Sequence, residues 1–172
     1  MKLLQGRDHH EAVIGAVREA RTSVWIGTAN VKQMLVRGAG RRYRSVLTVL
    51  AERARAGVEL RLLHASRPSR PFIESFDDEP DLISAMELRM CPRVHFKVVI
   101  VDGAQLYLGS ANWTGAGLGA KGDDRRNFEL GILTDDEQML DETQALYERV
   151  WRGGACATCK LRDQCEAPLD LG

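Results

Sequence analysis

Hydrophobic and polar positions follow two periods along this chain. Short stretches that are continuously or alternately apolar, rich in Val, Ile and Leu, are typical of strands, and they lie at 2–4, 23–28, 59–63, 94–101, 105–108 and 127–133. Longer stretches with apolar residues three or four positions apart predict helices from about 8 to 20, 42 to 56 and 137 to 151. Asp8 suits the N-cap of the first helix, and Gly57 suits the end of the second.

The order of these elements predicts an α/β fold with a mixed sheet flanked by helices, because strands alternate with helices and two strands then follow each other directly. Asp102-Gly103 separates those two strands and is a strong signal for a β-hairpin. The last helix is expected to face inward with four apolar side chains, those of Leu140, Leu146, Tyr147 and Val150.

Composition limits the class of protein. The chain has 172 residues, of which 44% are hydrophobic and 28% charged, so we expect one folded domain rather than a disordered chain. The 24 basic and 24 acidic side chains cancel, which excludes a globally basic nucleic-acid binder but not a locally basic face. No apolar run approaches the roughly 18 residues of a membrane helix, and no secretory leader is visible. We therefore expect a cytoplasmic protein that makes no membrane contact.

Charge is unevenly distributed along the chain. Nine arginines stand against two glutamates between positions 37 and 70, whereas six acidic residues stand against one arginine between 71 and 90. The two segments could together create a field that steers a charged ligand, or they could pair with each other.

One stretch combines side chains suited to phosphodiester chemistry. It has the pattern H-x-K-x4-D-x6-G-S-x-N, formed by His95, Lys97, Asp102, Gly109, Ser110 and Asn112. Alternate side chains of a strand share a face, so His95 and Lys97 are expected on one face while Phe96 and Val98 pack on the other. Ser110 and Asn112 repeat the two-residue spacing after the hairpin. Two adjacent strands would then offer a nucleophile, a cation and neutral hydrogen-bond donors on one surface.

This pattern resembles the HKD signature of the phospholipase D superfamily. Asn112-Trp113-Thr114 and the segment from Asn127 to Gly131 also look like downstream elements of that family. The resemblance implies a phospholipase D-like fold with a single HKD domain, which we place at residues 1–153. Residues 154–172 would form a separate cysteine-rich tail.

The resemblance also implies a metal-free mechanism. One histidine attacks phosphorus to form a phosphohistidine, and a second histidine protonates the leaving oxygen and then activates water. His95 would fill both roles, Lys97 and Asn112 would hold the phosphoryl oxygens, and Ser110 would donate a hydrogen bond. Glu129 would accept from the ring N–H of His95 and fix its tautomer. Asp102 belongs to the motif, but its place in the hairpin turn favours a structural role.

Only one copy of the motif is present, although the implied mechanism needs two histidines. His9, His10 and His64 lack the lysine and asparagine that accompany His95. Members of the family with one copy place the site at a two-fold interface, where each subunit contributes the same residue. We therefore predict a homodimer with one composite site.

The substrates of the superfamily are phosphodiesters of lipids or nucleic acids. Candidate substrate-binding residues are mostly basic: Arg41, Arg42, Arg44, Arg125, Arg126 and Trp113. This arginine content favours a nuclease acting on DNA or RNA with little sequence specificity. Trp113 could instead be a packing residue, as aromatic side chains often are. The alternatives are a lipid phosphodiesterase and a non-catalytic nucleic-acid-binding subunit of a larger defence or repair complex.

The tail carries a further candidate site. Cys156, Cys159 and Cys165 have the spacing C-x2-C-x5-C, and Cys91 could supply a fourth ligand. We predict a structural zinc ion, with an iron–sulfur cluster and four free thiols as the alternatives. Either metal group would be structural, because the implied chemistry requires none.

Overall fold

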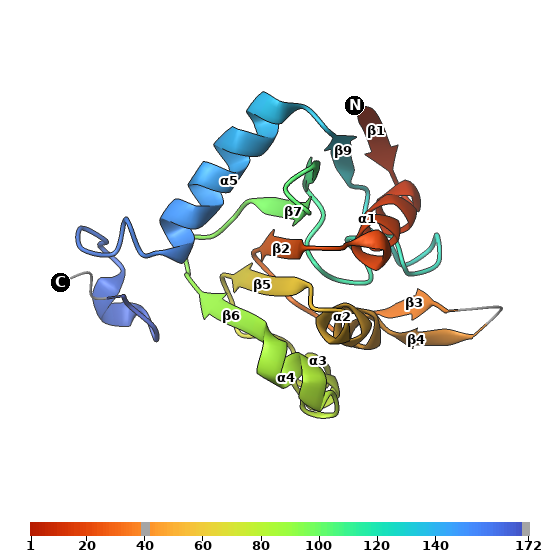
Figure 1. Ribbon diagram of the computed structural model, residues 1–172, viewed down its shortest axis with the longest axis horizontal. Coiled ribbons are helices and arrows are strands. Elements are labelled where there is room, and N and C mark those ends of the chain that lie inside the picture. The colour runs from red at the N-terminus through yellow and green to blue at the C-terminus, as the bar shows by residue number, and fades with distance from the viewer. Residues whose placement is uncertain (39–41, 170–172) are drawn as a thin grey trace.

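The computed structural model describes residues 1–38 and 42–169 and contains a seven-stranded mixed sheet (Figure 1). Its strands, in spatial order, are β1 (Lys2–Gln5), β9 (Leu130–Thr134), β8 (Gln105–Gly109), β7 (Lys97–Val101), β2 (Ser23–Thr28), β5 (Glu59–His64) and β6 (Met86–Met90). The neighbours β2, β5 and β6 run parallel, and every other pair is antiparallel. The predicted mixed sheet flanked by helices is confirmed.

Helices cover both faces of this sheet. One face packs on α1 (Asp8–Glu19) and α2 (Val46–Arg55), with α3 (Arg70–Asp77) and α4 (Pro80–Ala85) beside α2. The opposite face packs on α5 (Glu137–Trp151), as Figure 1 shows. The sheet is therefore the middle of three layers, with a hydrophobic core on each side.

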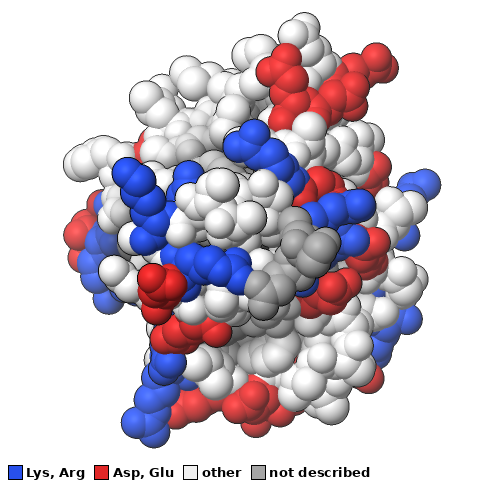
Figure 2. All heavy atoms as spheres, turned by 90° about the vertical axis from the view of Figure 1, so that its left-hand side faces the viewer, with Lys and Arg blue, Asp and Glu red and all other residues white. Residues whose placement is uncertain are grey.

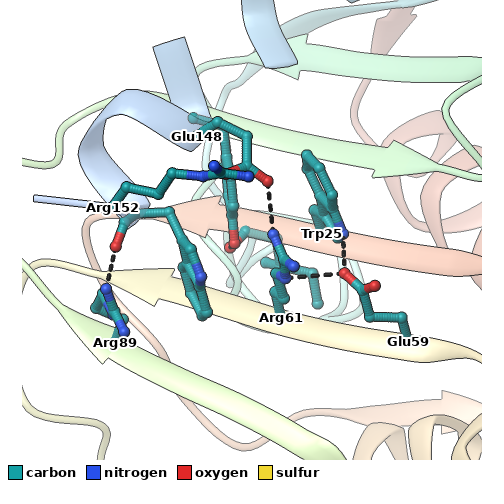
Figure 3. A network of polar contacts seen from close by, with 9 residues as sticks. Trp25, Glu59, Arg61, Arg89, Glu148 and Arg152 are labelled. Carbon is teal, nitrogen blue, oxygen red and sulfur yellow. Dashed lines mark hydrogen bonds and ion pairs between the residues drawn. The ribbon is translucent and has the colours of Figure 1, made fainter. Parts of the chain in front are cut away.

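A polar network fixes α5 to the sheet (Figure 3). The guanidinium of Arg61, on β5, lies between two indole rings, 4.7 Å from the centroid of Trp25 and 5.3 Å from that of Trp151. It also forms ion pairs of 2.8 Å with Glu59 and 2.6 Å with Glu148 of α5. Because the Arg61 side chain is only 19% exposed, these contacts are poorly screened by solvent.

The predicted hairpin between β7 and β8 is present, and its backbone explains the choice of residues. Asp102 and Gly103 have φ values of 55° and 61°, in the left-handed region that Asp and Gly tolerate best. Asp102 is the single non-glycine residue with positive φ in the described part of the chain.

The second helix is shorter than predicted. The expected range of 42–56 contains β4 (Tyr43–Ser45), which pairs with β3 (Leu35–Arg37) in a two-stranded sheet. The Ser45 hydroxyl then accepts a hydrogen bond from the Leu47 N–H and caps α2, which the sequence pattern did not reveal. Gly57 follows the helix with φ of 82°, as expected for a C-terminal glycine.

Other boundaries also differ from the predicted ones. The strands expected from 94 and 127 begin at Lys97 and Leu130, so the predicted site residues His95 and Glu129 lie in the loops before them. Asp8 is the first residue of α1 rather than its cap. Leu146 is 42% exposed, contrary to its expected inward position on α5, and the short elements α3, α4 and β6 were not predicted.

The loop after β8 closes against the start of α1. Gly119 has φ of 70°, and a Cβ atom on it would lie 2.3 Å from the carbonyl oxygen of Gly6. Glycine is required there both by the backbone conformation and by the close approach of the two chain segments. None of the described helices is both long enough and apolar enough to cross a bilayer.

Candidate active site

The motif residues gather at one end of the sheet. Lys97 begins β7 and pairs with Gly109 at the end of β8, which in turn pairs with Gly131 near the start of β9. Gly27 of β2 pairs with Val98, so Thr28 comes next to Lys97. The segments that precede β7 and β9 and follow β2 and β8 therefore meet at this end.

His95 and Lys97 lie on the same side of their segment, as the two-residue spacing predicts. The Lys97 ammonium nitrogen lies 3.1 Å from Nδ1 of His95 and donates a 2.6 Å hydrogen bond to the His95 carbonyl. Burial lowers the pKa of Lys97, although the nearby Glu129 carboxylate opposes this shift. The imidazole itself is exposed, whereas Lys97 is 7% exposed, so an anchored cation stands beside an accessible ring.

Asn112 is oriented by two groups from the end of β2. Its Oδ1 accepts hydrogen bonds from the Asn30 backbone N–H at 3.1 Å and the Thr28 hydroxyl at 3.2 Å. The N–H can only donate, so the amide oxygen must face it. No described residue accepts from the Asn112 amide nitrogen, which leaves two donors for a ligand oxygen.

Glu129 is held by neighbours other than the expected one. Its carboxylate accepts hydrogen bonds from the Ser110 hydroxyl and from Nδ2 of Asn127, the latter at 3.0 Å. Among the described residues it makes no hydrogen bond to His95, and the His95 ring faces the Lys97 ammonium instead. The expected Glu129–His95 contact is thus replaced by a Ser110–Glu129–Asn127 cluster beside the histidine.

Asp102 lies at the opposite end of β7, about 16 Å along the strand from Lys97 at roughly 3.3 Å per residue. Its carboxylate accepts backbone N–H bonds of 2.7–3.0 Å from Arg21, Thr22 and Ser23. Burial opposes ionisation, but these hydrogen bonds outweigh it and hold the pKa of Asp102 below its ordinary value. This geometry favours the structural role over a catalytic one.

Three polar residues near the site were not singled out from the sequence. Thr28 and His64 end the parallel strands β2 and β5 and are buried, and the Thr28 hydroxyl accepts from the Trp113 N–H at 3.0 Å. His9 donates from Nε2 to the Glu129 carbonyl at 3.2 Å, and its Nδ1 accepts from the Tyr107 hydroxyl at 3.0 Å. A polar residue at the carboxyl end of a buried parallel strand is the signal that could have identified the first two.

The predicted substrate-binding residues occupy different environments. Arg41 lies outside the described residues, Arg42 is exposed, and Arg44 forms an ion pair with Glu52. Arg125 is exposed, 3.8 Å from the carboxylate of Asp124, whereas Arg126 is paired with Asp123. Trp113 is 2% exposed, which favours the packing alternative over stacking on a base.

The basic and acidic segments pair in part. Arg55 of α2 forms a 2.8 Å ion pair with Asp81 of α4, and Arg70 forms one of 2.7 Å with Glu74. These contacts favour mutual pairing over a long-range steering field.

The four cysteines lie together, but the structure does not support a metal site. Cys91, Cys156, Cys159 and Cys165 line one small pocket and are free thiols. Within residues 1–38 and 42–169, no group of three or more His, Cys, Asp or Glu residues is placed to hold a metal ion. The predicted zinc ion and iron–sulfur cluster are therefore not supported, and free thiols remain.

The cysteine-rich tail folds back on the body of the protein. It contains a short 3₁₀ helix (Arg162–Gln164), and Glu166 pairs with Arg67 at 2.9 Å. The Leu161 backbone N–H and the Arg93 guanidinium hold the pKa of the Cys159 thiol below its usual value. Figure 2 shows basic and acidic side chains interspersed over this face, without one dominant sign.

The sequence of this chain matches a known protein family. Residues 13–151 match a family model described as cardiolipin synthase, PLD-like domain. The chain belongs to the phospholipase D-like family. A search of curated protein sequences gave no match.

Solved structures share the phospholipase D-like fold. NucT from Helicobacter pylori has a TM-score of 0.64 at 18% identity, covering 86% of this chain and 92% of its own. Nuc from Salmonella typhimurium, a phospholipase D family member, has a TM-score of 0.65 at 19% identity, covering 87% and 93%. TrmBL2, an archaeal chromatin protein, has a TM-score of 0.55 at 12% identity, covering 87% and 51%.

Proposed function

We propose that this phospholipase D-like protein is a metal-independent phosphodiesterase that cleaves DNA or RNA through a phosphohistidine on His95, at a site completed by a second copy of the chain. The observation that carries the proposal is the exposed imidazole of His95 with the buried Lys97 ammonium 3.1 Å from its Nδ1. Asn112, anchored through its oxygen, adds neutral donors at the same end of the sheet.

The chemistry follows from what each group can do. A ring nitrogen of His95 attacks phosphorus and the bond to the leaving oxygen breaks, while His95 of the partner subunit gives its proton to that oxygen. The partner's His95 then takes a proton from water, whose oxygen displaces the phosphoryl group from the first histidine. In both steps the Lys97 ammonium offsets the charge on the non-bridging oxygens, and the Asn112 amide donates hydrogen bonds to them.

A second copy is needed because this chain offers one histidine in the required setting. His9 and His64 are buried and hydrogen-bonded to carbonyl oxygens, at 3.2 Å to Glu129 and 2.9 Å to Ser66. Neither is free to transfer a proton to a bound ligand. A two-fold contact would bring His95 from both subunits to the axis.

An exposed apolar surface beside the site supports such a contact. Phe128, next to Glu129, is fully exposed; Leu130 on β9 is 58% exposed, and Leu3 on the neighbouring edge strand β1 is 60% exposed. On the same face of the sheet, Phe96 and Leu146 line a hollow of about 290 Å³. Exposed apolar surface of this kind marks an interaction site, and its continuity with the incomplete active site favours a second copy as occupant.

Nucleic acid is the favoured substrate because exposed arginines are available to bind phosphates. Arg125 is exposed in the loop that leads to Glu129, and Arg42 is exposed on the β3–β4 hairpin. A guanidinium binds phosphate oxygens in a fixed two-pronged geometry. Because the net charge of the chain is zero, phosphates would be bound by such local groups rather than by a globally basic surface.

Cleavage in EDTA tests the proposal. We expect the wild-type protein to cleave DNA or RNA in excess EDTA, and we expect His95→Ala to reduce this activity by at least about a thousandfold, because the covalent step is lost. His64→Gln, at a buried histidine outside the proposed chemistry, is the matched control. Equal cleavage by wild type and His95→Ala would overturn the proposal, as would hydrolysis of phospholipids with no cleavage of nucleic acid.

A further inference from the structure

A second surface near the site has the chemistry of a nucleic-acid path. The β3–β4 hairpin and α1 enclose a groove of about 360 Å³ on the side of the molecule away from the tail (Figure 1). Its charged and aromatic lining consists of Arg7, His10, Glu11, Arg18, Arg37 and Tyr43. Three of these six side chains are permanent cations and one is an acid.

The cations of this groove are not neutralised within the protein. Among the described residues, no carboxylate lies within 4.0 Å of the guanidinium nitrogens of Arg7, Arg18 or Arg37. By contrast, Arg44 on the neighbouring position of the hairpin is paired with Glu52. Unpaired guanidinium groups that share one groove attract an extended polyanion.

Two polar atoms in the groove also lack partners. Nδ1 of His10 and Nε of Arg18 are buried and make no hydrogen bond within the described residues. Arg18 donates its terminal amino group to the Arg37 carbonyl, which ties the hairpin to α1 and holds the groove open. Buried polar atoms are normally satisfied, so these two leave hydrogen-bonding capacity in the groove for a ligand or solvent.

The groove also carries exposed apolar surface. Tyr43 is 63% exposed and Leu35 is 55% exposed, on opposite strands of the hairpin. An aromatic ring beside backbone-binding cations is the combination that binds single-stranded nucleic acids, because bases stack on the ring while phosphates meet the cations.

One end of the groove lies beside the segment that carries Glu129. The lining residues Arg7 and Gly119 adjoin Gly6, and the Arg126 guanidinium lies 3.8 Å from where a Gly6 Cβ would be. Two residues into α1, His9 donates to the Glu129 carbonyl. A strand lying along the groove would therefore lead directly to the segment that carries Glu129.

We propose that the groove between α1 and the β3–β4 hairpin binds the backbone and bases of a single-stranded nucleic acid and guides it to the active site. This inference rests on the proposed nuclease function and adds a strand preference and a path. Arg7 and Arg37 contact phosphates, and Tyr43 stacks on a base.

Binding of a fluorescein-labelled oligothymidylate to the His95→Ala protein, which cannot cleave it, tests the groove. Arg7→Gln and Arg37→Gln are each expected to weaken binding and to reduce the slope of log K against log salt by about 0.7, the contribution of one phosphate contact. Tyr43→Ala is expected to weaken binding about fivefold or more with the slope unchanged, because stacking releases no counterions.

Arg149→Gln is the matched control, since it removes the same charge from an exposed arginine on α5, which packs on the opposite face of the sheet from α1. Groove variants that bind with the affinity and slope of this control would overturn the proposal. Groove variants that lose binding to phosphatidylglycerol vesicles but keep oligonucleotide binding would also overturn it. Failure of the EDTA cleavage test with these binding changes intact would overturn the nuclease proposal alone.

Discussion

A single carboxylate organises the end of the sheet that lies away from the chemistry. Asp102 accepts hydrogen bonds from three successive backbone N–H groups, at Arg21, Thr22 and Ser23, and from the Thr22 hydroxyl. It therefore joins the β7–β8 hairpin to the turn that leads into β2. The residue that gives the HKD signature its last letter contributes here to the position of the strand rather than to the reacting atoms.

We expect Asp102→Asn to destabilise the protein by about 1–3 kcal/mol, because an amide group faces backbone N–H donors with only one acceptor. Asparagine tolerates the positive φ of this position, so the backbone is not strained by the change. Urea denaturation at neutral pH measures the effect. A variant as stable as the wild type would contradict the structural role.

The same residue predicts a loss of stability in acid. The pKa of Asp102 in the folded protein lies below its unfolded value of 3.8, so the carboxylate stabilises the fold above that pH and the contribution is lost as the pH falls through the folded pKa. Urea midpoints of the wild type and Asp102→Asn should therefore converge between about pH 4 and pH 2. A gap between the two midpoints that stayed constant over this pH range would show that the Asp102 carboxylate is not the source of the acid-dependent loss of stability.

At the scale of elements, α5 depends on one buried cation. Arg61→Leu is expected to lower the free energy of unfolding by about 2–3 kcal/mol. Glu148 and Glu59 each lose an ion-pair partner, and the cation shared by the two indole rings is removed. Arg70→Leu is the control, because its pair with Glu74 is largely exposed and is worth about 0.3–0.5 kcal/mol. Thermal or chemical unfolding measures both losses of stability. Equal losses in the two variants would show that Arg61 does not have this role in holding α5.

Elements with a strong apolar period could be predicted from the sequence. The strand Ser23–Thr28 and the helix Glu137–Trp151 have the predicted bounds, because their burial pattern is set by the residues themselves. The β3–β4 hairpin could not be predicted, since its three-residue strands carry exposed and charged side chains. The hydrogen bonds of Glu129 also depend on how a long loop folds, which spacing along the chain does not determine.

At the scale of the whole molecule, the activity of mixed dimers would test the proposed composite site. If each site needs His95 from both subunits, a one-to-one mixture of wild type and His95→Ala, exchanged to equilibrium, should retain about a quarter of the wild-type activity. Independent sites would retain about half. Rates on nucleic acid in EDTA, measured after subunit exchange, separate the two cases.

Phe128→Asp tests the contact surface itself. A charge on this fully exposed side chain should oppose burial against a second copy, so we expect a monomer in sedimentation and loss of cleavage. Arg125→Asp, in the same loop, places the same new charge on a polar position and serves as the control for the oligomeric state. An unchanged dimer for Phe128→Asp would exclude this surface from the interface.

Two histidines, the buried His64 and the partly buried His10, predict that the fold weakens in mild acid. Burial, together with the Arg18 and Arg7 charges against the opposing Glu11, lowers the pKa of His10, and burial lowers that of His64. The unfolded chain binds protons more readily near pH 6.5, so this stability is complete above that pH and declines below it. Urea midpoints should fall from pH 7.5 to 5.5, and less steeply in His10→Gln and His64→Gln. If the urea midpoints of both variants fell with pH as steeply as those of the wild type, the two histidines would not be the cause of the loss of stability.

The apposition of Gly119 and Gly6 has a consequence for random mutagenesis. A library screened only for soluble, folded protein should lose almost every substitution at position 119, because any side chain collides with the facing carbonyl whatever the enzyme does. The same library should tolerate many residues at the exposed His95. Screening it again for turnover would remove that tolerance at position 95 and leave position 119 unchanged. The difference between the two screens would separate residues that build the scaffold from those that perform the reaction.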